Sequence, residues 1–207
     1  MRNKFSKEKR IIQKQPNGLF FFTQFYVAAY DKSMRFIEYD RQASVAYARR
    51  WAFARNPAFY DFSRLGGDCT NFASQCLFAG CNVMNYTPDI GWFYRSLQDR
   101  AAAWTGVEYF YRFLISNLGD YPAENGNVVG SGAGPFAVER PVQDLEIGDF
   151  VQFGRTTGDF YHTPMVVGFL GGEPLVAAHS NDAFDRPLSS YSYSQIRGIH
   201  ILGARIP

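Results

Sequence analysis

The sequence predicts an α+β fold, with helices in the first part of the chain and an antiparallel sheet in the second. Apolar residues recur every three or four positions over residues 38–55 and again from Thr105, a spacing typical of amphipathic helices. After residue 149, short apolar and β-branched runs separated by glycines indicate strands. Helices followed by strands is the α+β order. With 207 residues, 20 Phe and 13 Tyr, the chain can bury the core of one substantial domain.

Residues 1–37 are expected to form an N-terminal extension to a domain of residues 38–207. A basic stretch over residues 1–14 and an apolar run over residues 19–29 have the ingredients of a secretory signal. The run is shorter than the about 20 residues that cross a bilayer as a helix, so no integral membrane segment is expected. Its polar interruptions also fit a segment that packs on the domain. A cytoplasmic protein and one exported to the cell wall both remain open.

The helices are expected to follow one another with short connectors. The first should stop at Asn56-Pro57, because a residue before proline disfavours the helical conformation. The second should begin at Cys69 and end near Gly80, a residue type suited to helix C-termini. Loops are expected over residues 81–104 and 119–135, and strands over residues 149–153, 160–169, 174–180 and 198–205.

The register of the predicted sheet depends on Gly171-Gly172, which favours a two-residue hairpin turn. Counting outward from this turn places His162 opposite Asn181. It places His179 opposite Pro164. Because side chains alternate along a strand, His162, His179 and Asn181 would then share one face. A slip of one residue would move His179 and Asn181 to the opposite face of the sheet. Pro164 also lacks the backbone N–H that a strand residue donates to its neighbour, which weakens this register.

The run Gly66-Gly67-Asp68-Cys69-Thr70-Asn71-Phe72 places a thiol in the first turn of a predicted helix. Unpaired backbone N–H groups and the helix dipole favour negative charge there, so the thiol is expected to ionise more easily than a free cysteine. Asp68 could cap the helix and is expected to point at backbone donors. The alternative is a buried structural cysteine.

A base for this thiol must come from the three histidines, His162, His179 and His200. The hairpin register favours His162, with His179 or Asn181 orienting its far ring nitrogen. His200 lies in the terminal strand and is expected to be an ordinary strand residue.

Several motifs resemble known families. Asp68 to Phe72 resembles the Asp-Cys-Ser-Gly-Phe signature of the papain-like bacterial cell-wall endopeptidases and the related cysteine, histidine-dependent amidohydrolases. Residues 145–153 resemble the strand that precedes the histidine strand in those enzymes. The Gly-Gly-Asp-Cys run and residues 179–188 are also similar to the bacterial putative amidase domain family, over about residues 38 to 207.

This resemblance implies a papain-like fold and a cysteine-dependent amidase or peptidase acting on a peptide or peptidoglycan-like substrate. It implies Cys69 as nucleophile, His162 as general base and His179 as the orienting residue, with Asn181 as the competitor for that position. Asp182 is a further polar candidate, although strict alternation points it away from His162. The Cys69 backbone N–H would hold the oxyanion, with a second donor unassigned.

Other classes of function are less well supported. A formal charge of +2 gives no argument for binding nucleic acid. The cysteines and histidines lack zinc-site spacing, so no metal or cofactor is expected. Trp104 could line a substrate groove, although aromatics at such positions usually pack in the core. A catalytically idle module on the same fold, or an acyl or amine transferase, remains an alternative, and the sequence leaves the oligomeric state open.

Overall fold

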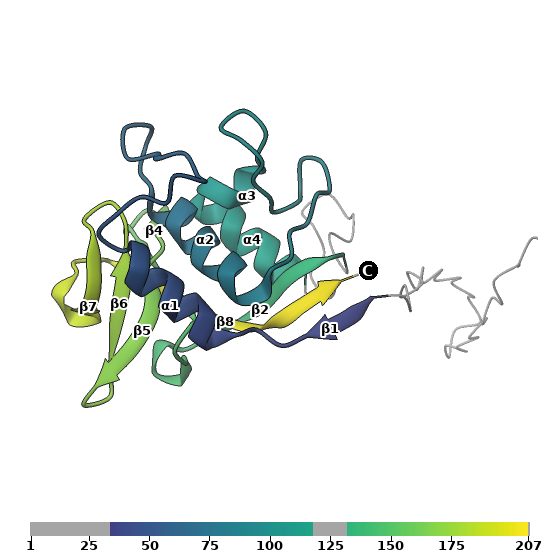
Figure 1. Ribbon diagram of the computed structural model, residues 1–207. Helices are drawn as coiled ribbons and strands as arrows, with labels where there is room; N and C mark the ends of the chain where they lie inside the picture. The colour runs from purple at the N-terminus through teal and green to yellow at the C-terminus, as the bar shows by residue number, and fades with distance from the viewer. Residues whose placement is uncertain (1–33, 118–131, 207) are drawn as a thin grey trace, which may run out of the picture. The chain divides into compact units, whose positions relative to one another are not determined.

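The computed structural model describes residues 34–117 and 132–206. Its described part is α+β, as predicted, with a few helices gathered on one side of a curled antiparallel sheet (Figure 1). Most of the predicted extension, most of the predicted loop over residues 119–135 and the last residue lie outside the described residues.

The helices are α1 (Arg41–Trp51), α2 (Cys69–Cys81), α3 (Ala102–Thr105) and α4 (Val107–Ser116). Two 3-10 turns, η1 (Val142–Asp144) and η2 (Leu188–Ser190), lie between strands. The strands are β1 (Arg35–Ile37), β2 (Gly134–Arg140), β3 (Phe150–Gly154), β4 (Phe160–His162), β5 (Met165–Leu170), β6 (Glu173–Ala178), β7 (Ala183–Pro187) and β8 (Gln195–Ile206).

The long strand β8 pairs with three other strands of the sheet, β1, β2 and β3. It pairs with β3 through residues 195–199 and with β2 and β1 further along, and the order of the main path is β1-β8-β3-β5-β6-β7. Strands β1, β2 and β7 were not predicted. Strand β1 falls inside the predicted extension, so residues 35–37 of that segment belong to the sheet.

Helices α1 and α2 pack closely because small residues lie where they meet. Ser44 and Ala48 of α1 are fully buried, and Ser44 Oγ donates to the carbonyl of Cys76 at 2.8 Å. A Cβ atom on Gly80 would lie 2.2 Å from the Tyr39 ring. Gly80 is therefore needed for the close approach of Tyr39. The helix ends at Cys81, one residue beyond the predicted end, and Gly80 is not its C-cap. Asn82 caps the helix with a left-handed φ of 50°.

The predicted hairpin turn is confirmed, but the register beyond it is not. Gly171 and Gly172 have positive φ, and Leu170 lies opposite Glu173. An irregularity between Val166 and Gly168 then shifts the pairing by one residue, so Met165 faces Ala177. The predicted pairings of His162 with Asn181 and of Pro164 with His179 are therefore wrong.

The predicted strand over residues 160–169 is also interrupted. Strand β4 ends at His162 and β5 begins at Met165, with Thr163 and Pro164 in neither. His162 pairs with Phe153 of β3, whereas Met165 pairs with Phe150. The missing N–H of Pro164 fits this break in the ladder.

Apolar clusters cover both faces of the sheet. The larger one packs between the sheet and helices α2 and α4, and it includes the fully buried Trp104, whose Nε1 donates to Asn71 Oδ1 at 2.9 Å. The suggested groove role of Trp104 is therefore wrong, because no face of its ring reaches solvent. The smaller cluster consists of Leu145, Val151, Phe153, Val166, Val176 and Leu188.

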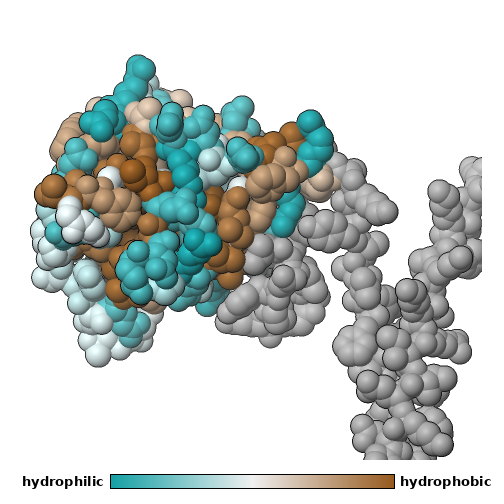
Figure 2. All heavy atoms as spheres, turned by 90° about the horizontal axis from the view of Figure 1, so that it is seen from below, coloured by the Kyte–Doolittle hydropathy of each residue, from teal (hydrophilic) through white to brown (hydrophobic). Residues whose placement is uncertain are grey.

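The surface mixes polar and apolar groups. Figure 2 shows the two kinds interleaved on the face seen from below. None of the helices within the described ranges has the length and apolar character needed to cross a membrane.

Candidate active site

Cys69 is the first residue of α2, as the sequence predicts. The chain reaches it through Gly66 and Gly67, whose φ values of 99° and 118° suit glycine. A Cβ atom on Gly67 would also lie 3.4 Å from Ser180 Oγ. The two glycines therefore let the start of α2 approach the turn between β6 and β7.

The Cys69 sulfur lies beside the backbone that flanks His162. Its Sγ is 3.9 Å from the carbonyl oxygen of Tyr161 and 3.8 Å from Thr70 Oγ1. Only 7% of the residue is exposed, and this burial raises the pKa of the Cys69 thiol despite hydrogen bonding from the Thr163 backbone. The expectation of an easily ionised thiol is wrong, because desolvation outweighs the hydrogen bonds from Thr163 and Thr70 that favour the thiolate.

The His162 ring lies near the aromatic rings of Phe153 and Tyr191, with centroids 5.8 and 5.9 Å away. Its Nε2 atom is buried without a hydrogen-bond partner. Within residues 34–117 and 132–206, no hydrogen bond joins the ring to Cys69. Burial, and secondarily the positive charge of Arg186, lowers the pKa of His162 to about 4, so the ring is neutral near pH 7.

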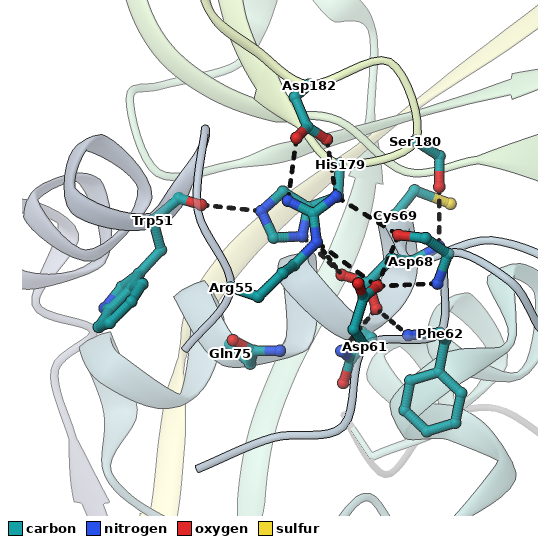
Figure 3. A network of polar contacts seen from close by, with 12 residues as sticks. Trp51, Arg55, Asp61, Phe62, Asp68, Cys69, Gln75, His179, Ser180 and Asp182 are labelled. Carbon is teal, nitrogen blue, oxygen red and sulfur yellow. Dashed lines mark hydrogen bonds and ion pairs between the residues drawn. The ribbon is translucent and has the colours of Figure 1, made fainter. Parts of the chain in front are cut away.

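His179 does not lie where an orienting partner of His162 is needed. Its Nδ1 is 2.5 Å from Asp68 Oδ2 and its Nε2 is 2.9 Å from the carbonyl oxygen of Trp51 (Figure 3). Both ring nitrogens therefore have other partners. The predicted hydrogen bond from His162 to His179 is replaced by one to Asp68, because the register shift moves His179 away from His162.

Asp68 points at backbone donors, but not at those of its own helix. It makes no side-chain cap on α2. Its Oδ1 accepts hydrogen bonds from the Phe62 N–H and from Asn71 Nδ2, each at 2.8 Å. Its Oδ2 faces His179 and lies 3.7 Å from Arg55 Nε. The side chain thus anchors the helix start to the loop before it and to the β6–β7 turn.

The other predicted candidates lie at the edge of this network. Asn181 is exposed in the β6–β7 turn with a φ of 95°, away from the position that would orient His162. Asp182 receives two hydrogen bonds of 2.9 Å from Arg55. His200 is more than an ordinary strand residue, because its Nδ1 is 2.7 Å from Asp149 Oδ2 in a second buried pair.

Sequence reasoning missed two members of the network, Arg55 and Ser180. Ser180 Oγ accepts a 2.7 Å hydrogen bond from the Asp68 N–H. Both residues are adjacent to motif positions, but nothing in their spacing shows that they meet. No set of three or more metal-ligating side chains gathers anywhere in the described ranges.

Comparison with known proteins identifies the family. The putative amidase domain family matches residues 38–202 of the chain. The chain belongs to this family. This confirms the narrower resemblance seen in the sequence. Among curated proteins, an uncharacterised Bacillus subtilis (strain 168) protein, YhbB, is 34% identical over 154 residues. The match covers 72% of this chain and 44% of that protein, so the chain spans less than half the length of this relative. No solved structure matches.

The buried neutral ring of His162 predicts a specific pH dependence of stability. In the unfolded chain His162 binds a proton near its ordinary pKa of 6.5, but in the folded protein only near 4. The unfolded state therefore binds more protons between these values, and the free energy of unfolding falls as the pH drops from 7 to 4. The contribution of this ring is about 3 kcal/mol.

Urea denaturation at pH 7 and pH 4 measures how much the free energy of unfolding falls between these pH values. This fall should be smaller for His162→Gln than for the wild type, because the two proteins share every other titrating group. An equal loss in both proteins would show that His162 does not carry this pH dependence.

Proposed function

We propose that the chain is a thiol-dependent amide-bond hydrolase with a papain-like arrangement, in which Cys69 is the nucleophile and His162 the general base. Membership of the putative amidase domain family supports amide hydrolysis. A helix that begins with a cysteine and docks on a histidine-bearing antiparallel sheet supports the papain-like arrangement. The observation that carries the proposal is the position of Cys69 Sγ, 3.9 Å from the carbonyl next to His162.

A contact between sulfur and imidazole requires the His162 ring to turn toward the thiol. No hydrogen bond from the described residues holds the ring where it is, and leaving its buried Nε2 unpaired costs about 1–3 kcal/mol. Because the sulfur already lies beside the backbone of residue 162, rotation about the side-chain bonds is the movement needed. Catalytic hydrogen bonds often form only when substrate binds.

The protonation states support attack by a neutral pair. At pH 7 the thiol keeps its proton and His162 is neutral. As Sγ bonds to the amide carbonyl carbon, the thiol proton passes to His162, which then donates it to the leaving amine. Water then gives a proton to the same ring and attacks the thioester carbon. The acid is released as the carbon–sulfur bond breaks, and the proton on His162 returns to the Cys69 sulfur. The first-turn N–H groups of α2 are the available donors for the oxyanion.

Peptides with free carboxylates, such as those of peptidoglycan, are the proposed substrate class. Two cations lie on tyrosines next to His162: Arg186 Cζ is 3.9 Å from the Tyr191 ring centroid and Arg155 Cζ is 4.6 Å from that of Tyr161. Neither guanidinium forms an ion pair with another described residue, although Arg186 donates hydrogen bonds to the hydroxyl and the carbonyl of Ser190. A planar guanidinium binds a carboxylate through two hydrogen bonds, which supports an acidic ligand at this position.

A catalytically idle module on the same fold is the second candidate. The raised pKa of the Cys69 thiol and the lack of a hydrogen bond between it and His162 among the described residues favour it. In that case, Cys69 would be a buried helix-terminal residue with no special reactivity.

Hydrolysis of a mixture of muropeptides and N-acyl dipeptide amides tests the leading proposal. We expect products from the wild type and a loss of at least about 1000-fold in Cys69→Ala, because the covalent route is removed. Cys81→Ala is the matched control, since Cys81 is a buried cysteine at the other end of α2. Product formation that survives in Cys69→Ala, or no product from any protein, would count against the hydrolase.

Alkylation by iodoacetamide at pH 7 distinguishes the two candidates. If His162 accepts the thiol proton, His162→Gln should slow modification of Cys69 by at least about tenfold. The extent of labelling is read by mass spectrometry of the peptide that contains Cys69. Equal rates in wild type and His162→Gln would favour the idle module.

A further inference from the structure

His179 is a buried ring with a hydrogen-bond partner on each nitrogen. Its side chain and that of Asp68 are each 1% exposed, and Figure 3 shows the ring between Asp68 and Trp51. The distances are 2.5 Å from Nδ1 to Asp68 Oδ2 and 2.9 Å from Nε2 to the Trp51 carbonyl oxygen. Neither His179 nor Asp68 takes part in a chemical step of the proposed reaction, which uses Cys69 and His162.

The hydrogen-bond partners of the two ring nitrogens indicate the protonation state of His179. A carbonyl oxygen only accepts hydrogen bonds, so Nε2 carries a proton. Asp68 Oδ1 accepts from two N–H donors, and Arg55 Nε lies 3.7 Å from Oδ2. These contacts favour the ionised carboxylate. These hydrogen bonds favour a proton on each ring nitrogen, with Asp68 as the carboxylate and His179 as an imidazolium.

The imidazolium joins the end of one helix to the start of the next. Trp51 is the last residue of α1, where the carbonyl groups carry partial negative charge and favour a cation. Asp68 is the N-cap residue of α2. The ring also stacks on Phe72 of α2, with centroids 3.9 Å apart and planes 18° from parallel. Asp68, Phe72 and the α1 terminus thus hold one ring from three sides.

The turn that carries His179 makes two more contacts with this region. Ser180 Oγ accepts the Asp68 N–H at 2.7 Å. Arg55, near Asp68, makes two hydrogen bonds to Asp182 at 2.9 Å. Since Asp68 is bonded through both its backbone and its carboxylate, the next residue, Cys69, has little freedom to move.

We infer that His179, as an imidazolium bound to Asp68, is a positioning residue that fixes Cys69 and offsets the negative charge beside its thiol. The inference rests on the proposed function only in taking Cys69 as the nucleophile. His179 itself touches neither the sulfur nor a reacting atom.

The electrostatic part of this role has a definite sign. The negative charge of Asp68 raises the pKa of the Cys69 thiol, although less than burial does. Removing the positive charge of His179 leaves that carboxylate less compensated, so thiolate formation should move to higher pH. Removing the carboxylate should move it to lower pH. The other charged or titratable groups that face this cluster are Arg55, Asp61, Asp182 and Tyr47.

The chain supplies a matched control in His200. Its Nδ1 lies 2.7 Å from Asp149 Oδ2, and this pair is also buried, with side-chain exposures of 7% and 0%. Asp149 is held by Arg41 and by backbone N–H groups of Glu146 and Ile201. Replacing either histidine removes a buried pair, but only His179 adjoins the start of α2.

The test measures the alkylation rate of Cys69 against pH in the full chain, by mass spectrometry. We expect His179→Gln to slow labelling at pH 7 by at least about tenfold. It should also move the midpoint of the rate–pH curve to higher pH. Asp68→Asn should move the midpoint to lower pH. The double variant Asp68→Asn with His179→Gln should return it toward the wild-type value, and His200→Gln should leave it unchanged.

Four results of the labelling test would overturn the inference. The first is a folded His179→Gln protein with the wild-type profile, and the second is an Asp68→Asn midpoint that does not fall. The others are a double variant that keeps the His179→Gln midpoint and a His200→Gln protein that behaves like His179→Gln. If His179→Gln does not fold, the inference is tested by the labelling midpoint of Asp68→Asn and by ¹⁵N NMR of the histidines in the wild-type protein. NMR should show both nitrogens of His179 protonated at pH 7, and a neutral ring would contradict the inference. None of these measurements requires the protein to hydrolyse a substrate. A failure of this inference can therefore be distinguished from a failure of the proposed function.

Discussion

The hydrogen bond between the Asp68 carboxylate and His179 is the constraint on which the candidate site depends. It joins residues 111 positions apart in the chain and brings the start of α2 against the turn that follows β6. Two glycines before Asp68 allow this approach, and Ser180 holds the Asp68 backbone from the same turn. A polar pair this deeply buried is stable only when its remaining hydrogen-bonding capacity is satisfied, and both members have further partners here.

The surroundings of the thiol and of the proposed base differ from that pair. Cys69 and His162 are both desolvated, and in each case burial favours the neutral form. The two residues therefore suit a reaction in which the proton moves as the sulfur attacks, rather than one that begins from a stable ion pair. Asp68 precedes Cys69 in the chain, and its contacts with His179 and Arg55 hold the start of α2 against the turn that follows β6.

Local features of the fold could be predicted from the sequence, and features that depend on packing could not. The Gly171-Gly172 turn and the start of α2 at Cys69 follow from residue types at fixed positions. The role of Gly80 does not, because a glycine near a helix end signals a C-cap equally well, and only the Tyr39 ring shows why it is needed.

The same limit explains the error at His179. Its assignment depended on an uninterrupted ladder, and a single irregularity between Val166 and Gly168 changes which side chains share a face. Pro164 indicated that this strand would break but not where the pairing would resume. The network through Arg55 and Ser180 depends on three separate loops meeting, which no local pattern encodes.

The most direct test of the site is a crystal structure of the protein with Cys69 trapped by a peptide aldehyde. In this adduct the Cys69 sulfur bonds to the aldehyde carbon, which mimics the tetrahedral intermediate. We expect a His162 ring nitrogen within hydrogen-bonding distance of the adduct, with the Asp68–His179 hydrogen bond unchanged. A His162 ring that remains against Phe153 and Tyr191 in the adduct, or a Cys69 that does not react, would contradict it.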